Sequence, residues 1–165
     1  MKKYTLLLLF VFTALFSCTT EETTTYYLIR HAEKVRTDAT NRNPNLNDVG
    51  KERAASWRTY FKNIDLEAIY STKYNRTIQT ASPTSKQKKL PIQFYDPRKM
   101  YTEEFAAATK GKTILIVGHS NTTPVFANKI LGEAKYKNMN DDDNSSLYIV
   151  SIVGSKKKSR IEILE

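Results

Sequence analysis

The 165-residue chain has a single cysteine, Cys18. One cysteine cannot form a disulfide within the chain, and it cannot supply the several thiolates of a cysteine-based zinc site. The sequence therefore predicts a domain that is held together by its core, and it excludes a metal site built on thiolates.

Long apolar runs, internal repeats and stretches of biased composition are also missing. The one extended apolar run, residues 4–16, is shorter than the roughly 20 residues that cross a bilayer as a helix. It follows Lys2 and Lys3, and a basic start before a short apolar run is typical of a secretory signal. The sequence thus predicts export rather than a membrane-spanning helix.

The segment Leu15-Phe16-Ser17-Cys18 resembles a bacterial lipoprotein signal. That resemblance implies cleavage before Cys18, lipid on its thiol and acylation of the new N-terminus, which together give stable anchoring. We expect residues 1–17 to be the signal peptide, 18–24 the lipidated cysteine and a polar tether, and 25–165 the domain. The expected location is the cell envelope, membrane-anchored and facing the periplasm or exterior. The alternative is an ordinary secretory peptide in which the cysteine is incidental.

The formal charge is +9, and about +7 without the signal peptide, because residues 1–17 hold two lysines and no acid. The positive charge is spread along the chain. Its one tight cluster, Lys156–Lys158, follows Gly154-Ser155, which is typical of a hairpin tip rather than of a nucleic-acid groove. We therefore expect no nucleic-acid partner, whereas a phosphorylated small molecule or envelope glycan fits the charge.

The remaining sequence, long enough for one domain, alternates between short β-rich runs and segments of helical periodicity. A long polar loop, residues 33–44, follows the first strand. We expect strands at 26–30, 66–71, 92–95 and 113–117, with a closing hairpin at 147–153 and 160–164. We expect helices at 48–62, 74–86 (disturbed at Pro83), 98–110 and 123–131. This order predicts an α/β fold, a three-layer α/β/α sandwich with a mostly parallel sheet.

The chain has only two histidines, and each closes one of the predicted strands. His31 follows the first strand directly after Arg30, and His119 follows the fourth directly after Gly118. Open α/β sheets place their binding crevice at the carboxyl ends of the strands. Both imidazoles are therefore expected in one site, and their neighbours favour phosphoryl chemistry.

Four segments resemble, in order, motifs of the histidine phosphatase superfamily, which has the phosphoglycerate mutase-like fold. They are residues 28–33 (LIRHAE), 46–50 (LNDVG), 70–81 (YSTKYNRTIQTA) and 117–120 (VGHS). The corresponding motifs are arginine-histidine-glycine, leucine-threonine-x-x-glycine, serine…arginine-x-x-glutamine-threonine-alanine and glycine-histidine. The resemblance covers residues 25–153, and the chain is similar to the short single-domain branch.

The resemblance implies a role for each of four residues. His31 would accept the phosphoryl group on an imidazole nitrogen and pass it to water. Arg30 and Arg76 would grip the phosphate oxygens, since a guanidinium can donate to two oxygens at once. His119 would complete the pocket. These cations would neutralise the phosphate, so neither a metal nor another cofactor is expected.

The general acid is the least defined part of the expected site. Phosphomonoester cleavage benefits from an acid that protonates the leaving oxygen, and the candidates are Glu103, Glu104 and Asp96. The family's usual glycine after the nucleophile is replaced by Ala32, and residues 34–38 lack the asparagine of the mutases, which disfavours a mutase.

We therefore expect a metal-independent phosphatase that acts on phosphomonoesters, or on phosphoramidates as in the phosphohistidine phosphatase branch. The alternatives are an envelope lipoprotein that binds phosphate or another anion with weak or no catalysis, and an interaction domain that uses the fold as a scaffold.

Overall fold

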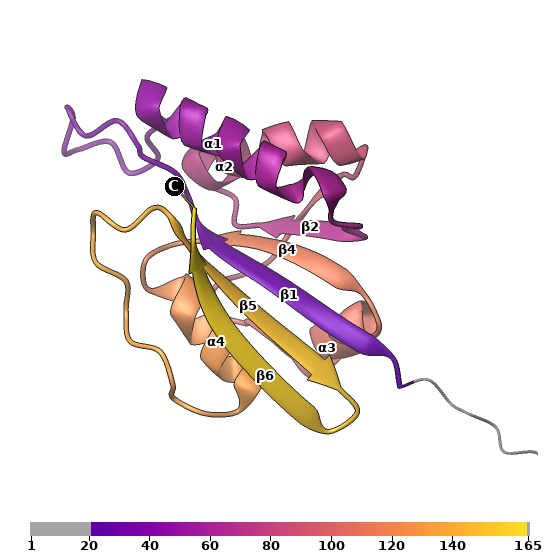
Figure 1. The fold of residues 1–165 in the computed structure, drawn as a ribbon. Coiled ribbons are helices and arrows are strands. Elements are labelled where there is room, and N and C mark those ends of the chain that lie inside the picture. Colours follow the sequence, from indigo (N-terminus) through magenta and orange to yellow (C-terminus); the bar gives the residue numbers. More distant parts are fainter. Residues whose placement is uncertain (1–20, 165) are drawn as a thin grey trace, which may run out of the picture.

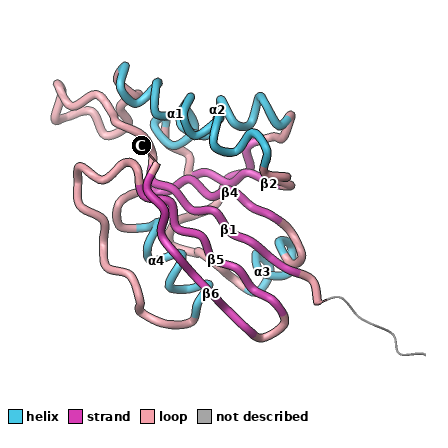
Figure 2. The backbone as a smooth tube through the Cα atoms, viewed as in Figure 1, coloured by secondary structure: helices cyan, strands magenta, loops and turns pink. Residues whose placement is uncertain are grey.

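The computed structural model describes residues 21–164, which fold around one mixed sheet (Figures 1 and 2). The strands are β1 (Thr23–Arg30), β2 (Ala68–Ser71), β3 (Ile92–Phe94), β4 (Thr113–Gly118), β5 (Ser146–Val153) and β6 (Lys156–Ile163). The helices are α1 (Asp48–Tyr60), α2 (Asn75–Lys88), α3 (Glu103–Thr109) and α4 (Thr122–Leu131), and a 3-10 turn at Phe61–Asn63 extends α1. The signal sequence and Cys18 lie outside the described residues.

The strand order is β3-β2-β4-β1-β5-β6, and β3, β2, β4 and β1 run parallel. The hairpin β5–β6 adds to β1 in the antiparallel direction. Helices α1 and α2 cover one face of the sheet, and α3 and α4 cover the other (Figure 1). The predicted α/β/α sandwich with a mostly parallel sheet and a closing hairpin is therefore confirmed.

Each face of the sheet has its own apolar core. Trp57 and Phe61 pack with Ile69, Leu115 and Ile149 on the α1–α2 face. A second cluster lies on the α3–α4 face, centred on Tyr26, Leu28, Ile114, Ile116 and Phe126. Successive residues of β1 and β4 thus point to opposite cores, which explains why these strands are apolar throughout.

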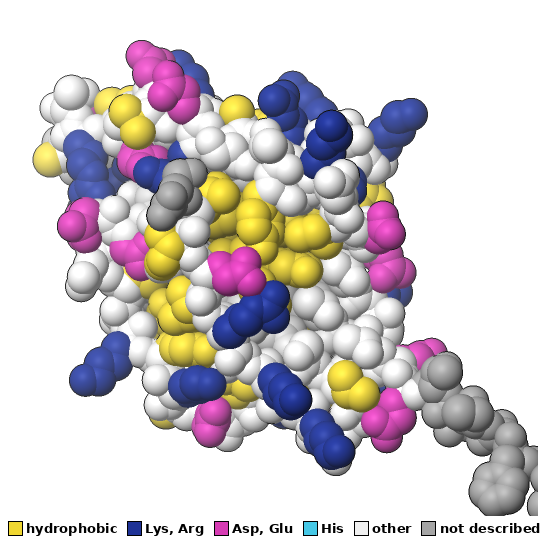
Figure 3. All heavy atoms as spheres, viewed as in Figure 1, with side chains coloured by type: hydrophobic (Ala, Val, Ile, Leu, Met, Phe, Trp, Pro, Cys, Tyr) yellow, Lys and Arg dark blue, Asp and Glu magenta, His cyan; other side chains and the backbone are white. Residues whose placement is uncertain are grey.

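The α1–α2 layer leaves part of the sheet uncovered. Figure 3 shows apolar side chains gathered there, bordered by charged ones. On this side, Tyr60 donates its hydroxyl to Glu162 at 2.6 Å, and Glu162 also pairs with Arg160 at 2.8 Å. Among residues 21–164, no helix combines the length and the apolar composition that crossing a bilayer requires.

Several predicted boundaries were wrong. β1 begins at Thr23, inside the expected tether, because Thr23 and Thr24 pair with β5. The lysines 156–158 belong to β6, and the hairpin turn consists of Gly154, with φ of 56°, and Ser155. The turn is therefore tighter than the sequence suggested, since glycine permits this left-handed backbone.

Two predicted helices also differ. α3 begins only at Glu103, because Tyr101 has a φ of 49° and Thr102 then caps the helix by accepting from Phe105 N at 3.2 Å. α2 runs through Pro83 to Lys88 without a break. Burial of the adjacent Ala81 and Thr84 holds this part of α2 in place despite the hydrogen bond that proline removes.

The surroundings of Gly50 explain why the LNDVG segment ends in glycine. Asn47 caps α1 by accepting from Gly50 N at 2.8 Å, and Asn47 N donates to Glu33 O at 3.0 Å. The first turn of α1 therefore lies directly on the backbone of Glu33. A Cβ on Gly50 would overlap the Glu33 carbonyl group, so only glycine allows this approach.

We expect Gly50→Ala to destabilise the domain by about 3 kcal/mol, because backbone, which cannot swing aside, must move to admit the methyl group. Thermal or urea unfolding measures the change. Val49→Ala is the matched control, since Val49 is the preceding residue of the same helix and is exposed. Equal stability of the Gly50→Ala protein and the wild type would show that the contact is not needed.

Candidate active site

The carboxyl ends of β1, β2 and β4 bring the functional side chains together. Arg30 pairs with Gly118 in the parallel register, and His31 N donates to Gly118 O at 2.9 Å. The ring centroids of His31 and His119 are consequently 5.4 Å apart. Arg76, from the first turn of α2, reaches the same place, so His31, His119 and Arg76 form one cluster.

His31 is held as a neutral imidazole with a defined tautomer. Its Nδ1 lies 2.8 Å from the carbonyl oxygen of Ala32, which can only accept, so Nδ1 carries the proton and donates. The Nε2 atom then keeps its lone pair. The side chain is only 4% exposed, and burial is the main reason that its pKa falls to about 3. At neutral pH, Nε2 is therefore available as a nucleophile.

His119 is fixed by contacts at both ring nitrogens. Arg76 donates through NH2 to Nδ1 at 3.4 Å, so the proton of His119 resides on Nε2, which donates to Thr72 Oγ1 at 3.0 Å. Thr72 in turn donates to Thr77 Oγ1 at 3.0 Å, and Thr77 donates to backbone carbonyls. Burial, followed by the positive charge of Arg76, lowers the pKa of His119 to about 4.

Arg76 presents unused donors to this cluster. Its Nε and NH1 atoms are buried and have no hydrogen-bond partner among the described residues. The guanidinium carbon lies 4.4 Å from the ring centroid of Tyr74, which holds the group flat against the aromatic face. Burial lowers the pKa of Arg76 without removing its charge. Unpaired, buried N–H donors on a cation are suited to binding an anion.

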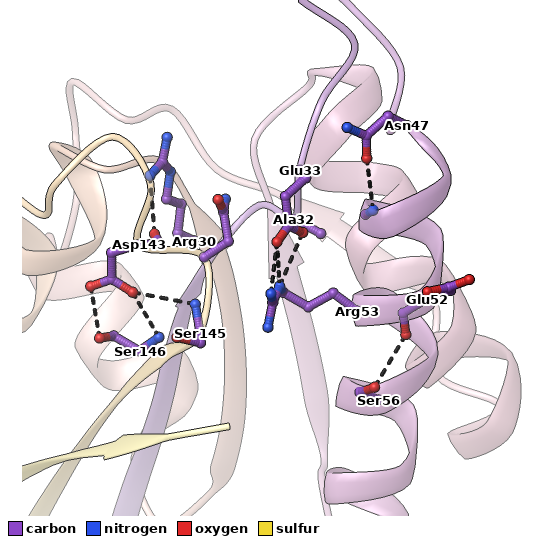
Figure 4. A network of polar contacts seen from close by, with 12 residues as sticks. Arg30, Ala32, Glu33, Asn47, Glu52, Arg53, Ser56, Asp143, Ser145 and Ser146 are labelled. Carbon is purple, nitrogen blue, oxygen red and sulfur yellow. Dashed lines mark hydrogen bonds and ion pairs between the residues drawn. The ribbon is translucent and has the colours of Figure 1, made fainter. Parts of the chain in front are cut away.

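Arg30 binds the loop that precedes β5. It is 2% exposed, and its NH1 donates to Asn140 O at 2.9 Å and to Asp143 O at 3.0 Å. Its NH2 pairs with Asp141 Oδ1 at 2.9 Å, so only Nε lacks a partner. Figure 4 shows Arg30 beside the segment of Asp143, whose carboxylate binds Ser145 and Ser146. Arg30 thus fixes the loop before β5, and its Nε–H has no partner among the described residues.

Three polar residues that the sequence analysis did not single out hold the backbone around His31. Thr80 Oγ1 accepts from Ala32 N at 2.9 Å and donates to Arg76 O at 2.7 Å. Asn144 Nδ2 donates to His31 O at 2.7 Å. Gln79 Oε1 accepts from Leu46 N at 2.8 Å. Gln79 and Thr80 lie in the quoted 70–81 segment, whereas nothing in the sequence pointed to Asn144.

Ala32, which replaces the family's usual glycine, is fully buried with Leu46 and Ala54. Its methyl group fills the space between the turn and α1. The alanine is therefore accommodated by packing and does not displace His31 from the cluster.

A cleft of about 730 Å³ opens beside His31, between the loop after β1 and the loop before β5. Asp141 bridges its two sides, with one oxygen on Arg30 and the other on Arg36 NH1 at 2.7 Å. These contacts lower the pKa of Asp141 to about 2, the Arg36 hydrogen bond being the main cause. Lys34 also lines the cleft, and its pKa is lowered mainly by burial.

The candidate general acids do not join the cluster. Glu103 and Glu104 are exposed at the start of α3, which packs against Tyr26 through Thr109, and no contact connects them with either histidine. Asp96 is closer, in a groove with Thr72 and Tyr74. Its hydrogen bonds with Arg98 lower its pKa to about 2, the opposite of what a general acid needs.

Glu33 lines the cleft beside His31, but its carboxylate binds Arg53, with a shortest distance of 2.7 Å (Figure 4). It is therefore occupied in positioning α1 against the loop. Within residues 21–164, no three His, Cys, Asp or Glu side chains are grouped so that they could hold a metal ion.

The two lowered imidazole pKa values predict a pH dependence of stability. The unfolded chain takes up protons near the ordinary histidine pKa of 6.5, whereas the folded chain does so only near pH 3 to 4. Protonation of the unfolded chain therefore lowers the free energy of unfolding. This loss is absent above pH 6.5 and grows as the pH falls below it. We expect the melting temperature of the wild type to fall more steeply between pH 6.5 and 4.5 than that of His31→Asn/His119→Asn, which has no imidazole. Parallel profiles would contradict the assignment.

Comparison with known proteins supports the same interpretation of the fold. A sequence profile described as the histidine phosphatase superfamily (branch 1) matches residues 26–97. No curated protein sequence matches the chain significantly.

Solved structures with the same fold share little sequence with the chain. A mycobacterial glucosyl-3-phosphoglycerate phosphatase has 13% identity and a TM-score of 0.65, with 86% of this chain and 98% of that chain covered. A phosphoglycerate mutase from Bacillus anthracis has 17% identity and a TM-score of 0.65, with 86% and 93% covered. SixA from Agrobacterium tumefaciens, named as a phosphohistidine phosphatase, has 18% identity and a TM-score of 0.62, with 84% and 97% covered. These likenesses show that the chain has the phosphoglycerate mutase-like fold, and the profile match over residues 26–97 is to the histidine phosphatase superfamily.

Proposed function

We propose that the protein is a metal-independent phosphatase that hydrolyses phosphomonoesters or phosphoramidates through a phosphohistidine on His31. The observation that carries the proposal is the hydrogen bond that His31 Nδ1–H donates to Ala32 O, because this bond leaves the buried Nε2 unprotonated. The phosphoryl group would bind between this atom, His119 and the unpaired N–H groups of Arg76.

In the first step, the Nε2 lone pair of His31 forms a bond to phosphorus as the bond from phosphorus to the leaving oxygen or nitrogen breaks. The electron pair of the broken bond stays on the leaving atom. A leaving oxygen takes its proton from water, whereas a nitrogen that is already protonated leaves as the neutral amine. Positive charge then develops on the imidazole, and the Ala32 carbonyl that accepts from Nδ1 stabilises it. Arg76 stabilises the charge on the phosphoryl oxygens.

In the second step, water attacks phosphorus on the face that the leaving group has vacated. The N–P bond breaks, its electron pair returns to Nε2, and inorganic phosphate leaves. Burial, which lowers the pKa of His31, disfavours positive charge on the imidazole and so favours the return of Nε2 to its neutral form in this step. The same environment therefore keeps the nucleophile unprotonated and favours its release.

The carboxylates near the site favour leaving groups that need little acid assistance. Asp96 and Asp141 both have pKa values lowered to about 2 by arginine contacts. The amine of a phosphoramidate whose nitrogen is protonated, or the acidic alcohol of an ester, can leave without a strong acid in the site. An ordinary alkyl phosphate would be cleaved more slowly.

We also propose that the protein is exported and anchored in the cell envelope through lipid on Cys18. β1 begins at Thr23 and ends beside His31, and a strand of its eight residues spans about 26 Å. The start of β1 lies at the opposite end of the sheet from the site (Figure 1). An anchor just before β1 would leave the site facing away from the bilayer, open to substrates in the aqueous phase.

The function is tested by incubating residues 19–165 with p-nitrophenyl phosphate without added metal. A reaction with a labelled substrate is quenched in alkaline detergent, and the retained label is then tested for acid lability. We expect turnover and an acid-labile phosphoenzyme in the wild type, and at least a hundredfold loss of both in His31→Ala. Glu103→Gln, at an exposed carboxylate outside the cluster, is the matched control and should stay active.

Phosphate binding without label or turnover in folded protein would favour the alternative, an anion-binding envelope lipoprotein. The absence of both binding and turnover would select the scaffold interpretation.

The anchor is tested separately, by labelling cells that express the full chain with radioactive palmitate and separating membranes from soluble material. We expect label and membrane association in the wild type. We expect neither in Cys18→Ser, because the lipid is attached to the sulfur atom of Cys18. Release of an unlabelled, soluble mature wild type would instead support an ordinary secretory signal.

A further inference from the structure

A second concave surface adjoins the catalytic cluster, and it shares no lining residue with the His31 cleft. It is a groove of about 860 Å³ between the segments that follow β2 and β3. Its lining residues are Thr72, Lys73, Tyr74, Phe94, Tyr95, Asp96, Pro97 and Arg98. We call it the β2–β3 groove. Because it is built on carboxyl ends of parallel strands, it shares the functional edge of the sheet.

The groove is continuous with the phosphoryl site. Thr72 forms the hydrogen bond to His119 Nε2, and Tyr74 lies edge-on to the His119 ring with centroids 5.2 Å apart. Tyr74 also stacks under Arg76. Two of its lining residues therefore contact the side chains proposed to hold the phosphoryl group, while His31 lines the separate cleft.

Its walls are aromatic and accessible. The Tyr74 side chain is 39% exposed, and Phe94, the last residue of β3, is 49% exposed. Lys73 Nζ lies 5.5 Å from the Phe94 ring centroid. Tyr95 is packed against Phe126 in the core, with ring centroids 5.4 Å apart, which makes the back of the groove rigid. Exposed aromatic faces beside a reaction centre are platforms for stacking.

The leaving group can reach this groove from the phosphoryl site. Attacking and leaving atoms lie roughly in line on opposite sides of phosphorus, so the leaving group extends away from His31 Nε2. Thr72 and Tyr74, which border the groove, contact His119 and Arg76, the side chains proposed to hold the phosphoryl oxygens. The groove therefore begins directly beside the phosphoryl position.

We infer that the β2–β3 groove is the leaving-group subsite and that it selects substrates with a planar aromatic ring, such as an aryl group or a nucleobase, attached to the transferred phosphate. This inference rests on the proposed function. The ring stacks on Phe94 and Tyr74, and Lys73 provides a cation for acceptor atoms at its edge. The groove has two cationic side chains, Lys73 and Arg98. Arg98 forms an ion pair with Asp96 at 2.9 Å, whereas Lys73 has no ion pair among the described residues.

The test measures binding of two phosphonates that cannot be hydrolysed, by titration calorimetry. Benzylphosphonate carries an aromatic ring where the leaving group would be, and methylphosphonate lacks it. We expect benzylphosphonate to bind the wild type about tenfold more tightly, a factor within the usual range for stacking on an aromatic side chain. Phe94→Ala should abolish this preference and leave the affinity for methylphosphonate unchanged.

Ile161→Ala is the matched control, because Ile161 is an exposed apolar residue on β6, outside the groove. It should keep the tenfold preference. Far-ultraviolet circular dichroism and the melting temperature verify that each variant is folded.

Equal affinity of the wild type for the two phosphonates would overturn the inference while leaving the proposed function intact. A preference that persists in Phe94→Ala would also overturn it, because the ring would then bind elsewhere. If neither phosphonate binds to folded wild type, the phosphate pocket itself is absent, and the proposed function fails together with the subsite.

Discussion

The parallel pairing of β1 with β4 is the constraint on which the site depends. The register places Arg30 opposite Gly118, and the hydrogen bond from His31 N to Gly118 O continues the ladder by one residue. Both imidazoles must therefore emerge at the same edge of the sheet. The helices matter to function through this edge, because α1 presses on the Glu33 backbone and α2 delivers Arg76 and Thr80 to it.

Burial gives the cluster its chemistry. Two imidazoles lie next to Arg76, and no carboxylate pairs with Arg76 among the described contacts. Low dielectric and neighbouring positive charge keep both imidazoles neutral, which preserves a lone pair on His31 and leaves unsatisfied cationic donors. In the proposed function, a bound phosphoryl group would supply the missing negative charge. The nearby carboxylates instead form ion pairs that hold loops in position. These pairs are Glu33–Arg53, Asp141–Arg36 and Asp96–Arg98.

Most of the fold and part of the site could be predicted because they follow from local patterns. Strand-end histidines, the Asn47 cap and the glycine at position 50 are signals that a short window contains. The contacts of Arg30 with Asn140 and Asp143 could not be predicted, because those residues lie more than 100 positions away in the sequence. Asn144 was missed for the same reason. The start of α3 at Glu103 could not be predicted either, because it follows the left-handed backbone at Tyr101 and no residue there signals this conformation. The predicted helix at 98–110 therefore placed Glu103 and Glu104 in its middle rather than at its start.

The central claim is that His31 is a neutral imidazole protonated at Nδ1, with a free Nε2. Nitrogen-15 NMR of histidine-labelled protein tests it directly, since the chain has only two histidines and His119→Asn identifies the His31 signals. We predict a protonated Nδ1 and an unprotonated Nε2 at pH 7, with no titration down to about pH 4. A proton on Nε2 at neutral pH, or titration near the ordinary pKa of 6.5, would contradict the account.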